Sequence, residues 1–408
     1  MVLNSSFRYV GGALQVDDFA LEAIASEVGT PVYVYSLRRV LGNYRRLRRA
    51  FAPLSAQLHY SVKANGNAAI VEALAKQGSG FDCVSGGEIR QALAAGGAAR
   101  QIVFAGVGKT RAEIEYAVER GVGWLNVENA LELEYIQAAA ERTGAESVLV
   151  ALRLNPEVTA KTHPKIATGH GGAKFGMTAA VIHALLAKRN AYPRINFAGI
   201  HIHIGSQLGD SQATIRAVEK ALELARPYPQ IRAINLGGGL PVAYQFAESP
   251  PPVDELVQAL SSRLGEYRVL LEPGRAIVAD AGALLAEVLY VKRQAGQVFY
   301  IVDAGMTDLL RPALYDAHHE VLPLRKASSR GEVAQLVGPV CESTDVLARD
   351  RLLPPLQVGD KIALMTAGAY GMAMASNYNA RPLPAEVLVD AAGAGWRASR
   401  SRNLLPEK

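Results

Sequence analysis

The chain has 408 residues, of which 50% are hydrophobic and 20% charged, with a formal net charge of +5. This composition is typical of a soluble globular protein, and the length favours a large barrel with a second domain over one small domain. Only two cysteines occur, Cys83 and Cys341, far apart in the sequence. They exclude a disulfide framework and favour a reducing compartment, so we expect a cytoplasmic location.

Charge and hydropathy argue against membrane and nucleic-acid partners. The first ten residues lack the basic start and apolar core of a signal peptide, and no apolar run could span a bilayer. The densest basic run, Arg45 to Arg49, falls in a stretch that reads as helix, where charges usually form a solvated face. We therefore expect neither a membrane nor a nucleic-acid partner.

From about residue 57 to residue 281, short strand-like runs alternate with amphipathic helical stretches. The predicted strands are 58–62, 81–84, 102–105, 124–127, 148–154, 197–204, 231–236 and 268–271. The predicted helices include 68–77, 86–95, 111–119, 130–142 and 213–225. Such alternation indicates parallel β/α units, and eight of them predict a (β/α)8 barrel. The alternative, a doubly wound sheet, would need fewer strands and a nucleotide-binding fingerprint near the first one.

After residue 283 the pattern becomes β-rich. The predicted strands 288–293, 298–302, 332–337, 361–365 and 385–389 are joined by Gly, Pro and Asp turns. The strand-like runs 7–16 and 31–35 could join them. We therefore expect a barrel formed by residues 37–283 and a sandwich- or barrel-like β domain formed by residues 1–36 and 284–408. Residues 391–408 are expected to be a loose tail.

Candidate active residues follow the predicted barrel strands, because barrels of this kind carry their active sites there. They are Lys63 after the first strand, His201 and His203 in the sixth, Gly237–Gly239 after the seventh, and Glu272, Gly274 and Arg275 after the eighth. Most lysines are solvated surface charges. An amine held in a barrel mouth, however, is partly desolvated, which disfavours the ammonium form as a Schiff-base lysine requires.

The glycines after the last two strands have two interpretations. Gly237–Gly239 could be a flexible turn, or they could let backbone N–H groups approach a phosphate at a helix N-terminus. Because barrels often bind phosphate after strands seven and eight, where Gly237–Gly239 and Gly274 fall, we favour the phosphate site.

His201 and His203 alternate along the predicted strand, so they share a face and could form a metal pair. The other histidines complete no metal set, so we expect no metal and a core or stacking role for His203. Glu272 could be a buried salt-bridge partner. Beside a pyridine nitrogen, it would instead keep the ring protonated and able to accept electrons.

Two further positions lie in the β-rich region. Arg311 and Tyr315 are four residues apart, so one helical turn could aim both at a carboxylate, with surface pairing as the alternative. Cys341 lies beside Glu342 in a turn-rich segment, and a lone cysteine is more often a small buried hydrophobic residue than a catalyst.

An ordered series of motifs extends over nearly the whole chain, from Phe7 to Val389. It comprises YSVKAN at 60–65, GFDCVSGGE at 80–88, KTHPKIATG at 161–169, KFG at 174–176, HIGSQ at 203–207, NLGGG at 235–239, EPGR at 272–275, DAGM at 303–306, residues 311–319, GPVCES at 338–343, GAY at 368–370 and SNYN at 376–379. In this order, the motifs resemble those of diaminopimelate decarboxylases, which use pyridoxal 5′-phosphate (PLP) and have the alanine-racemase fold.

The resemblance implies a role for each matching residue. For the cofactor, these are Lys63 as the Schiff-base lysine, Asp82, His203 stacked on the ring, Glu272 at the pyridine nitrogen, and Ser206, Gly237, Gly238, Gly239, Gly274, Arg275 and Tyr370 at the phosphate. For the substrate, they are Arg275, Arg311, Tyr315 and Tyr370 around the distal carboxylate and Glu342 at the distal amine. The implied catalytic residues are Lys63, His203, Glu272 and Cys341, with Cys341 or Lys63 as the proton donor. Cys341 and Glu342 would reach the site of the partner subunit, which implies a homodimer.

The activity implied is the decarboxylation of meso-2,6-diaminopimelate to L-lysine and CO2, the last step of lysine biosynthesis. One alternative is a decarboxylase of another basic amino acid, such as ornithine, lysine or carboxynorspermidine. A monocarboxylate substrate would leave a buried Arg311 without its anion, and the resemblance leads us to expect Asp in ornithine enzymes where this chain has Glu342. The other alternative is a non-catalytic PLP-binding regulator, although every proposed catalytic position is filled.

Overall fold

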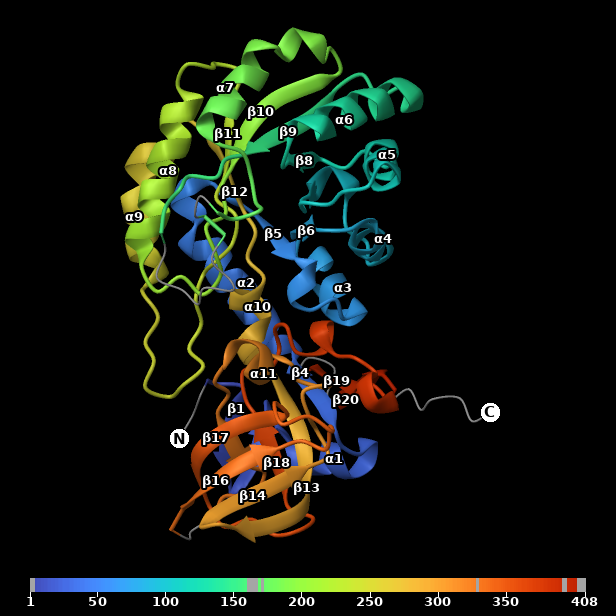
Figure 1. The fold of residues 1–408 in the computed structure, drawn as a ribbon, viewed down its shortest axis with the longest axis vertical. Coiled ribbons are helices and arrows are strands. Elements are labelled where there is room, and N and C mark those ends of the chain that lie inside the picture. The colour runs from blue at the N-terminus through green and yellow to red at the C-terminus, as the bar shows by residue number, and fades with distance from the viewer. Residues whose placement is uncertain (1–3, 160–167, 170–171, 328–329, 391–394, 402–408) are drawn as a thin grey trace. The chain divides into compact units, whose positions relative to one another are not determined.

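Eight parallel strands close into a barrel, as predicted (Figure 1). They are β5 (Gln57–Ser61), β6 (Gly80–Cys83), β7 (Ile102–Phe104), β8 (Trp124–Val127), β9 (Val148–Arg153), β10 (Ile195–His201), β11 (Ala233–Asn235) and β12 (Arg268–Leu271). The strands pair in chain order, and β12 returns to β5. Nearly all of their residues are buried, because the two faces of a barrel strand are both covered. The structure, a computed structural model, describes residues 4–159, 168–169, 172–327, 330–390 and 395–401.

Helices alternate with the barrel strands, and side-chain caps mark where several of them begin. They are α2 (Leu37–Ala50), α3 (Ala68–Lys76), α4 (Gly86–Ala94), α5 (Arg111–Glu119), α6 (Ala130–Thr143), α7 (Ala179–Ala187), α8 (Ser211–Ala225) and α9 (Val253–Leu264). Thr110 and Glu113, for example, form a reciprocal capping box at the start of α5. The basic run lies in α2, as predicted. Among the described residues, no helix is both long enough and apolar enough to cross a membrane.

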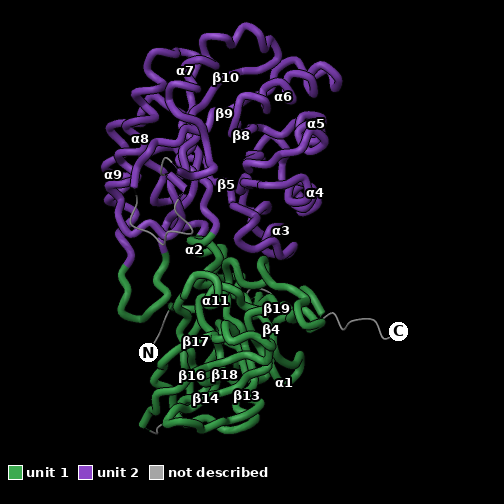
Figure 2. The backbone as a smooth tube through the Cα atoms, in the orientation of Figure 1, with its two compact units in different colours: residues 1–43, 242–249, 275–408 green, residues 44–241, 250–274 purple. Residues whose placement is uncertain are grey.

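The chain divides into two compact units, residues 44–241 with 250–274, and residues 1–43, 242–249 and 275–408 (Figure 2). The second of these units is β-rich. Its largest sheet contains β4 (Val32–Ser36), β13 (Gly282–Gln294), β14 (Gln297–Val302), β15 (Val321–Pro323), β16 (Glu332–Val337), β17 (Val346–Leu353), β18 (Lys361–Leu364), β19 (Ala385–Asp390) and β20 (Gly395–Arg400). A small sheet contains β1 (Phe7–Val10), β2 (Ala13–Val16) and β3 (Phe19–Ala20). The predicted β-rich region and its N-terminal strands are therefore present.

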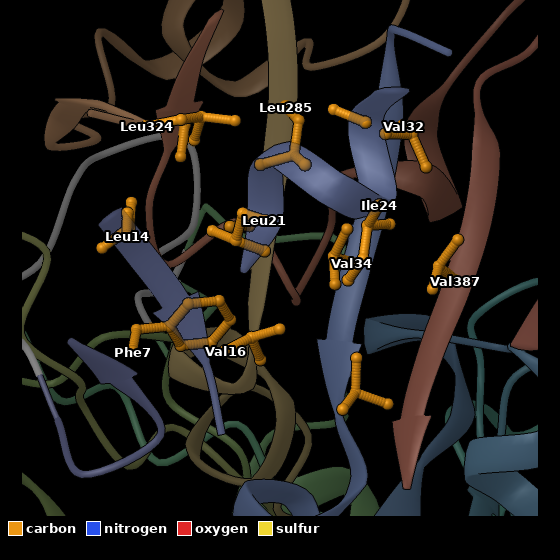
Figure 3. Close-up of a cluster of buried hydrophobic side chains, with 14 of the residues drawn as sticks. Phe7, Leu14, Val16, Leu21, Ile24, Val32, Val34, Leu285, Leu324 and Val387 are labelled. Carbon is orange, nitrogen blue, oxygen red and sulfur yellow. The ribbon is translucent and has the colours of Figure 1, made fainter. Parts of the chain in front are cut away.

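The N-terminal segment helps to build the core of the β-rich unit. β4 pairs with both β13 and β19, and all five of its residues are buried. Phe7 and Val16 from the small sheet, together with Ile24 from α1 (Leu21–Val28), pack in the same cluster as Val34 and Leu285 (Figure 3). This core explains why a segment so far from the C-terminal strands in sequence belongs to the same unit.

Several features of the β-rich unit differ from the sequence prediction: the run 7–16 forms two strands, β1 and β2, and the short β15 was not predicted. β13 begins at Gly282 rather than at residue 288, because its first residues pair with β4 and β18. β17 was missed, although it forms a long antiparallel pair with β16. The loose tail is wrong for residues 395–400, which form β20, pair with β19 and place Trp396 against the core. The rest of that tail, 391–394 and 402–408, lies outside the described residues except for residue 401.

Candidate active site

Lys63 lies in a short 3₁₀ turn, Val62–Ala64, directly after strand β5. Its Nζ donates to Asp82 Oδ2 at 2.8 Å, and Asp82 lies fully buried in β6. Ser61 Oγ donates to the same carboxylate at 2.7 Å. Burial raises the pKa of Asp82 above its ordinary value, although the opposite charge of Lys63 pulls it down. The amine of Lys63 is therefore held by one buried carboxylate at the carboxyl end of the barrel strands.

Glu272 follows strand β12 and is buried among three polar partners. Its Oε1 accepts from Asn126 Nδ2 at 3.0 Å and from Asn235 Nδ2 at 2.7 Å, and its Oε2 lies 3.4 Å from His201 Nε2. Burial alone would raise the pKa of Glu272, but the electrostatic influence of the neighbouring His201 and the charge of Lys63 hold that pKa below its ordinary value. Glu272 is therefore an oriented, ionised carboxylate inside the barrel.

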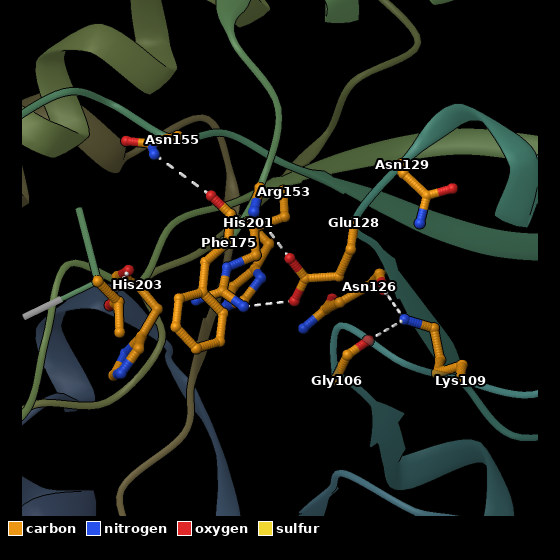
Figure 4. A network of polar contacts seen from close by, with 12 residues as sticks. Gly106, Lys109, Asn126, Glu128, Asn129, Arg153, Asn155, Phe175, His201 and His203 are labelled. Carbon is orange, nitrogen blue, oxygen red and sulfur yellow. Dashed lines mark hydrogen bonds and ion pairs between the residues drawn. The ribbon is translucent and has the colours of Figure 1, made fainter. Parts of the chain in front are cut away.

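Lys109, a buried lysine not predicted from the sequence, holds the backbone of Asn126, which is a partner of this carboxylate (Figure 4). Lys109 Nζ donates to the carbonyl oxygens of Gly106 and Asn126, at 2.7 and 2.8 Å, and pairs with Glu132 at 2.8 Å. The side chain of Asn126 in turn donates to Glu272. Lys109 thereby fixes the backbone of the residue that orients the Glu272 carboxylate.

His203 lies two residues beyond the end of β10, whereas we predicted it within the strand. The two histidines therefore have different partners: His201 faces Glu272, and His203 Nδ1 accepts from the N–H of Gly238 at 3.1 Å. Desolvation and the positive charges of Arg153 and Lys63 lower the pKa of His203 to about 3. Its ring is accordingly neutral, with the proton on Nε2, and suits stacking on a flat ligand.

The predicted phosphate-binding glycines approach neighbouring backbone too closely for any side chain. A Cβ at Gly238 would lie 2.5 Å from the carbonyl oxygen of Glu272, and Gly237 has a φ of +65°. A Cβ at Gly274 would lie 2.9 Å from the Cβ of Ala64, in the turn that carries Lys63. Only glycine fits these positions, and it leaves a segment whose backbone can line a cradle for a phosphate.

Ser206 lies in the loop that leads from β10 to α8, and this loop contacts the glycine segment. The N–H of Leu208 donates to the carbonyl oxygen of Gly239 at 3.0 Å. A Cβ on Gly239 would lie only 2.6 Å from the carbonyl oxygen of Gly205. The fold therefore brings Ser206 and the glycine segment to one region, as the phosphate-site prediction requires.

The KFG motif at 174–176 is anchored to the barrel by Glu128. This carboxylate pairs with Arg153 and accepts from the N–H of Gly176 at 2.8 Å. The guanidinium of Arg153 lies 4.7 Å from the centre of the Phe175 ring. The preceding motif at 161–169 lies outside the described residues apart from 168 and 169.

In the β-rich unit, two arginines are buried against one tyrosine. Arg275 begins α10 (Arg275–Val278), donates to the hydroxyl of Tyr244, and lies 4.8 Å from the centre of the Tyr370 ring. Arg311 lies 4.4 Å from the centre of the Tyr244 ring, and its Nη1 donates to His319 Nε2 at 2.9 Å. The arginines are only 7% and 6% exposed. Neither Tyr244, which lies in a loop without a periodic pattern, nor His319 was predicted to lie beside these arginines.

Arg311 and Tyr315 form the single helical turn that their spacing predicted, α11 (Arg311–Tyr315). Arg311 is buried, so surface pairing does not describe it, and Tyr315 is half-buried. The Nε of Arg311 has no hydrogen-bond partner among the described residues, and no carboxylate there forms an ion pair with this guanidinium. A buried cation of this kind is costly unless an anion joins it.

Cys341 and Glu342 lie exposed on the single chain, so the alternative of a small buried hydrophobic residue does not describe Cys341. The segment that carries them is nevertheless ordered by hydrogen bonds. The N–H of Cys341 donates to Asn379 Oδ1 at 3.0 Å, and the hydroxyl of Tyr378 donates to Glu342 Oε1 at 2.6 Å. The backbone at Cys341 and the side chain of Glu342 are therefore held in place at the surface of the single chain.

Comparison with known proteins identifies the family to which this geometry belongs. Residues 37–279 match the model of the pyridoxal-dependent decarboxylases, pyridoxal binding domain. A diaminopimelate decarboxylase of Neisseria meningitidis serogroup A is 44% identical over 393 residues, which cover 94% of this chain and 95% of the relative. The chain belongs to the diaminopimelate decarboxylase family of pyridoxal-dependent decarboxylases. The enzyme is accordingly a carboxy-lyase, and its cofactor is PLP.

Solved structures show the same relationship across the full length. The diaminopimelate decarboxylase of Helicobacter pylori, solved with L-lysine, has a TM-score of 0.89 at 37% identity and covers 93% of this chain and 96% of its own. The M. jannaschii enzyme has a TM-score of 0.92 at 36% identity, and the match covers 98% of this chain and 96% of that enzyme. A lysine/ornithine decarboxylase of Vibrio vulnificus is less similar, with a TM-score of 0.79 at 25% identity, 91% of this chain and 97% of that chain being covered.

The barrel residues fit PLP in charge and in space. Lys63 supplies the amine and Glu272 an ionised carboxylate. His203 supplies a neutral ring, and Gly237–Gly239 supply the segment where only glycine fits. When bound, PLP provides the acceptor for the electrons of the bond that is cleaved.

Proposed function

We propose that this enzyme decarboxylates meso-2,6-diaminopimelate to L-lysine and CO2, as the last step of lysine biosynthesis. The observation that carries the proposal is the buried pair Arg275 and Arg311, because Arg311 has no ion-paired carboxylate among the described residues. Diaminopimelate carries a second carboxylate, remote from the reacting carbon, and that carboxylate can be their anion. The solved Helicobacter pylori relative contains L-lysine, which retains such a carboxylate.

The barrel residues would hold the cofactor and control its charge. Lys63 would bind PLP, with Asp82 holding its amine near the strand ends. Glu272 would keep the pyridine nitrogen protonated, and His203 would stack on the ring as an uncharged surface. Ser206, Gly237–Gly239, Gly274, Arg275 and Tyr370 would bind the phosphate.

The substrate's far end would be recognised in the β-rich unit. Arg275, Arg311, Tyr315 and Tyr370 would take the distal carboxylate, and Glu342 would take the distal amine. We propose that Cys341 and Glu342 act in the site of a partner subunit, within a homodimer. Their exposure on the single chain, in a segment held by Tyr378 and Asn379, supports this arrangement. Cys341 or Lys63 would return the proton after CO2 leaves.

We propose a cytoplasmic location for the enzyme. Cys83 and Cys341 are both free thiols. A reducing compartment keeps free thiols reduced.

The test is lysine formation, followed by chromatography, from purified protein given meso-diaminopimelate with and without PLP. We expect lysine only when PLP is present, and none from the Lys63→Ala variant, which should remain a folded dimer. Absence of lysine from a folded, PLP-loaded wild-type protein would exclude the proposed reaction and favour another basic amino acid as substrate. Normal turnover by Lys63→Ala would exclude Lys63 as the cofactor-binding residue.

A further inference from the structure

We propose that Tyr244 and His319 are positioning residues that set the enzyme's preference for ligands with a distal carboxylate. This inference rests on the proposed function, because it concerns how Arg275 and Arg311 are held. Together, Tyr244 and His319 contact both guanidinium groups.

Tyr244 contacts the two arginines through different parts of its side chain. Its hydroxyl accepts a hydrogen bond from Arg275 Nη1, and its ring lies under the guanidinium of Arg311 at 4.4 Å. The side chain is buried, and its ring meets the ring of His319 edge-on, with centroids 5.4 Å apart. A single rigid aromatic group thus fixes both cations relative to each other.

The loop that carries Tyr244 is held in place by two carboxylates. The N–H groups of Tyr244 and Gln245 donate to Glu248 Oε2, at 2.6 and 3.2 Å. The N–H of Phe246 donates to Glu320 Oε1 at 3.1 Å. Because these bonds fix the backbone on both sides of Gln245, Tyr244 has little freedom to move away from the arginines.

His319 fixes Arg311 without neutralising it. Its Nδ1 donates to the carbonyl oxygen of Met365 at 2.8 Å, so its Nε2 is the acceptor for Arg311 Nη1. Burial and the charge of Arg311 hold the pKa of His319 well below its ordinary value, so the ring stays neutral. A carboxylate at this position would pair with Arg311 and cancel its attraction for a ligand anion. The neutral imidazole orients the guanidinium and leaves its charge for the ligand.

The chemistry of the product offers a direct probe of this arrangement. Removing one carboxylate from diaminopimelate gives L-lysine, which keeps the distal carboxylate and amine. Cadaverine is the same carbon chain without any carboxylate. The ratio of the two dissociation constants on the PLP-loaded enzyme therefore measures carboxylate recognition separately from recognition of the amine and the chain.

The experiment compares these two ligands by calorimetric titration of the PLP-loaded wild type and of four variants. Tyr244→Leu and His319→Leu should each reduce the preference for L-lysine over cadaverine by about tenfold or more. Tyr244→Phe keeps the ring beneath Arg311 and should lose less, and His319→Gln should restore part of the loss because its amide oxygen can accept from Arg311. His183→Gln, on the exposed surface of α7, is the matched control and should change nothing.

The possible outcomes separate this inference from the function on which it rests. A wild type that binds L-lysine no better than cadaverine would overturn both. A wild-type preference that persists in Tyr244→Leu and His319→Leu would overturn the inference alone, and so would an equal loss of affinity for both ligands. If the leucine variants fail to fold, the nearly isosteric Tyr244→Phe and the polar His319→Gln provide the test. An undiminished, wild-type preference for L-lysine over cadaverine in both variants would contradict the proposed roles.

Discussion

Replacing Glu272 by Gln tests whether the barrel supplies an ionised carboxylate to the cofactor. The substitution keeps the size of the side chain and an oxygen that can accept from Asn126 and Asn235, which lie 3.0 and 2.7 Å from Oε1. It removes the charge that faces His201 Nε2 at 3.4 Å. The change is therefore electrostatic, with little effect on packing.

The magnitude follows from the geometry of the buried carboxylate. Glu272 is buried, with only 5% of its surface exposed, and its carboxylate is held by Asn126 and Asn235. Removing one charge from a buried polar cluster typically costs about 3 to 5 kcal/mol, so we expect the PLP-loaded protein to be destabilised by about 3 kcal/mol. Loss of one oriented charge at a reacting group typically lowers kcat by about 10² to 10³, and we expect a loss of that size.

The assay measures kcat for lysine formation together with the absorbance of the bound cofactor. We expect PLP to remain attached through Lys63, so that the loss appears in kcat while cofactor content stays near that of the wild type. Glu272→Asp, which keeps the charge on a shorter side chain, is the control and should retain more activity than Glu272→Gln. A kcat for Glu272→Gln within threefold of the wild type, at full PLP content, would refute the assigned role.

Three further predictions concern the barrel site. Gly238→Ala places a Cβ 2.5 Å from the carbonyl oxygen of Glu272, so we expect PLP affinity, measured by equilibrium dialysis, to fall by about tenfold or more, and unchanged affinity would contradict the phosphate cradle. The lowered pKa of His203, about 3, means that the unfolded chain binds more protons there between pH 3 and the ordinary value of 6.5. Stability should therefore fall as pH drops through this window, and His203→Phe should weaken the dependence in thermal melts; identical pH profiles would contradict the prediction. Lys109→Met removes the cation that ties the backbone of Asn126 to Glu132, so we expect a lower melting temperature and a lower kcat at unchanged KM, whereas a wild-type kcat would show that this network does not orient Glu272.

The sequence predicted best those features that depend on residues close together in the chain. The strand-helix alternation predicted all eight barrel strands, because each β/α unit carries its own pattern. Lys63, Glu272 and Gly237–Gly239 could be proposed as site residues because barrel chemistry follows the ends of strands, and the structure places them after β5, β12 and β11. The spacing of Arg311 and Tyr315 likewise predicted their helical turn, since four residues make about one turn.

Features that depend on distant contacts were not visible in the sequence. Asn126 orients Glu272 across 146 residues, and Tyr244 meets Arg275 from a loop with no periodic pattern. His203 was placed in a strand because apolar residues continue past His201, although the regular pairing stops there. β20 was interpreted as tail because all of its residues except Trp396 are small or charged, and pairing with β19 makes them a strand.

The most direct test of the account is a comparison of kcat/KM for meso-diaminopimelate, L-lysine and L-ornithine on one preparation of PLP-loaded enzyme. The buried Arg275 and Arg311 predict a preference of about 100-fold or more for the substrate that has a second carboxylate. Equal or greater kcat/KM for L-lysine or L-ornithine would contradict the account, because the buried Arg311 would then have no anion to bind in the preferred substrate.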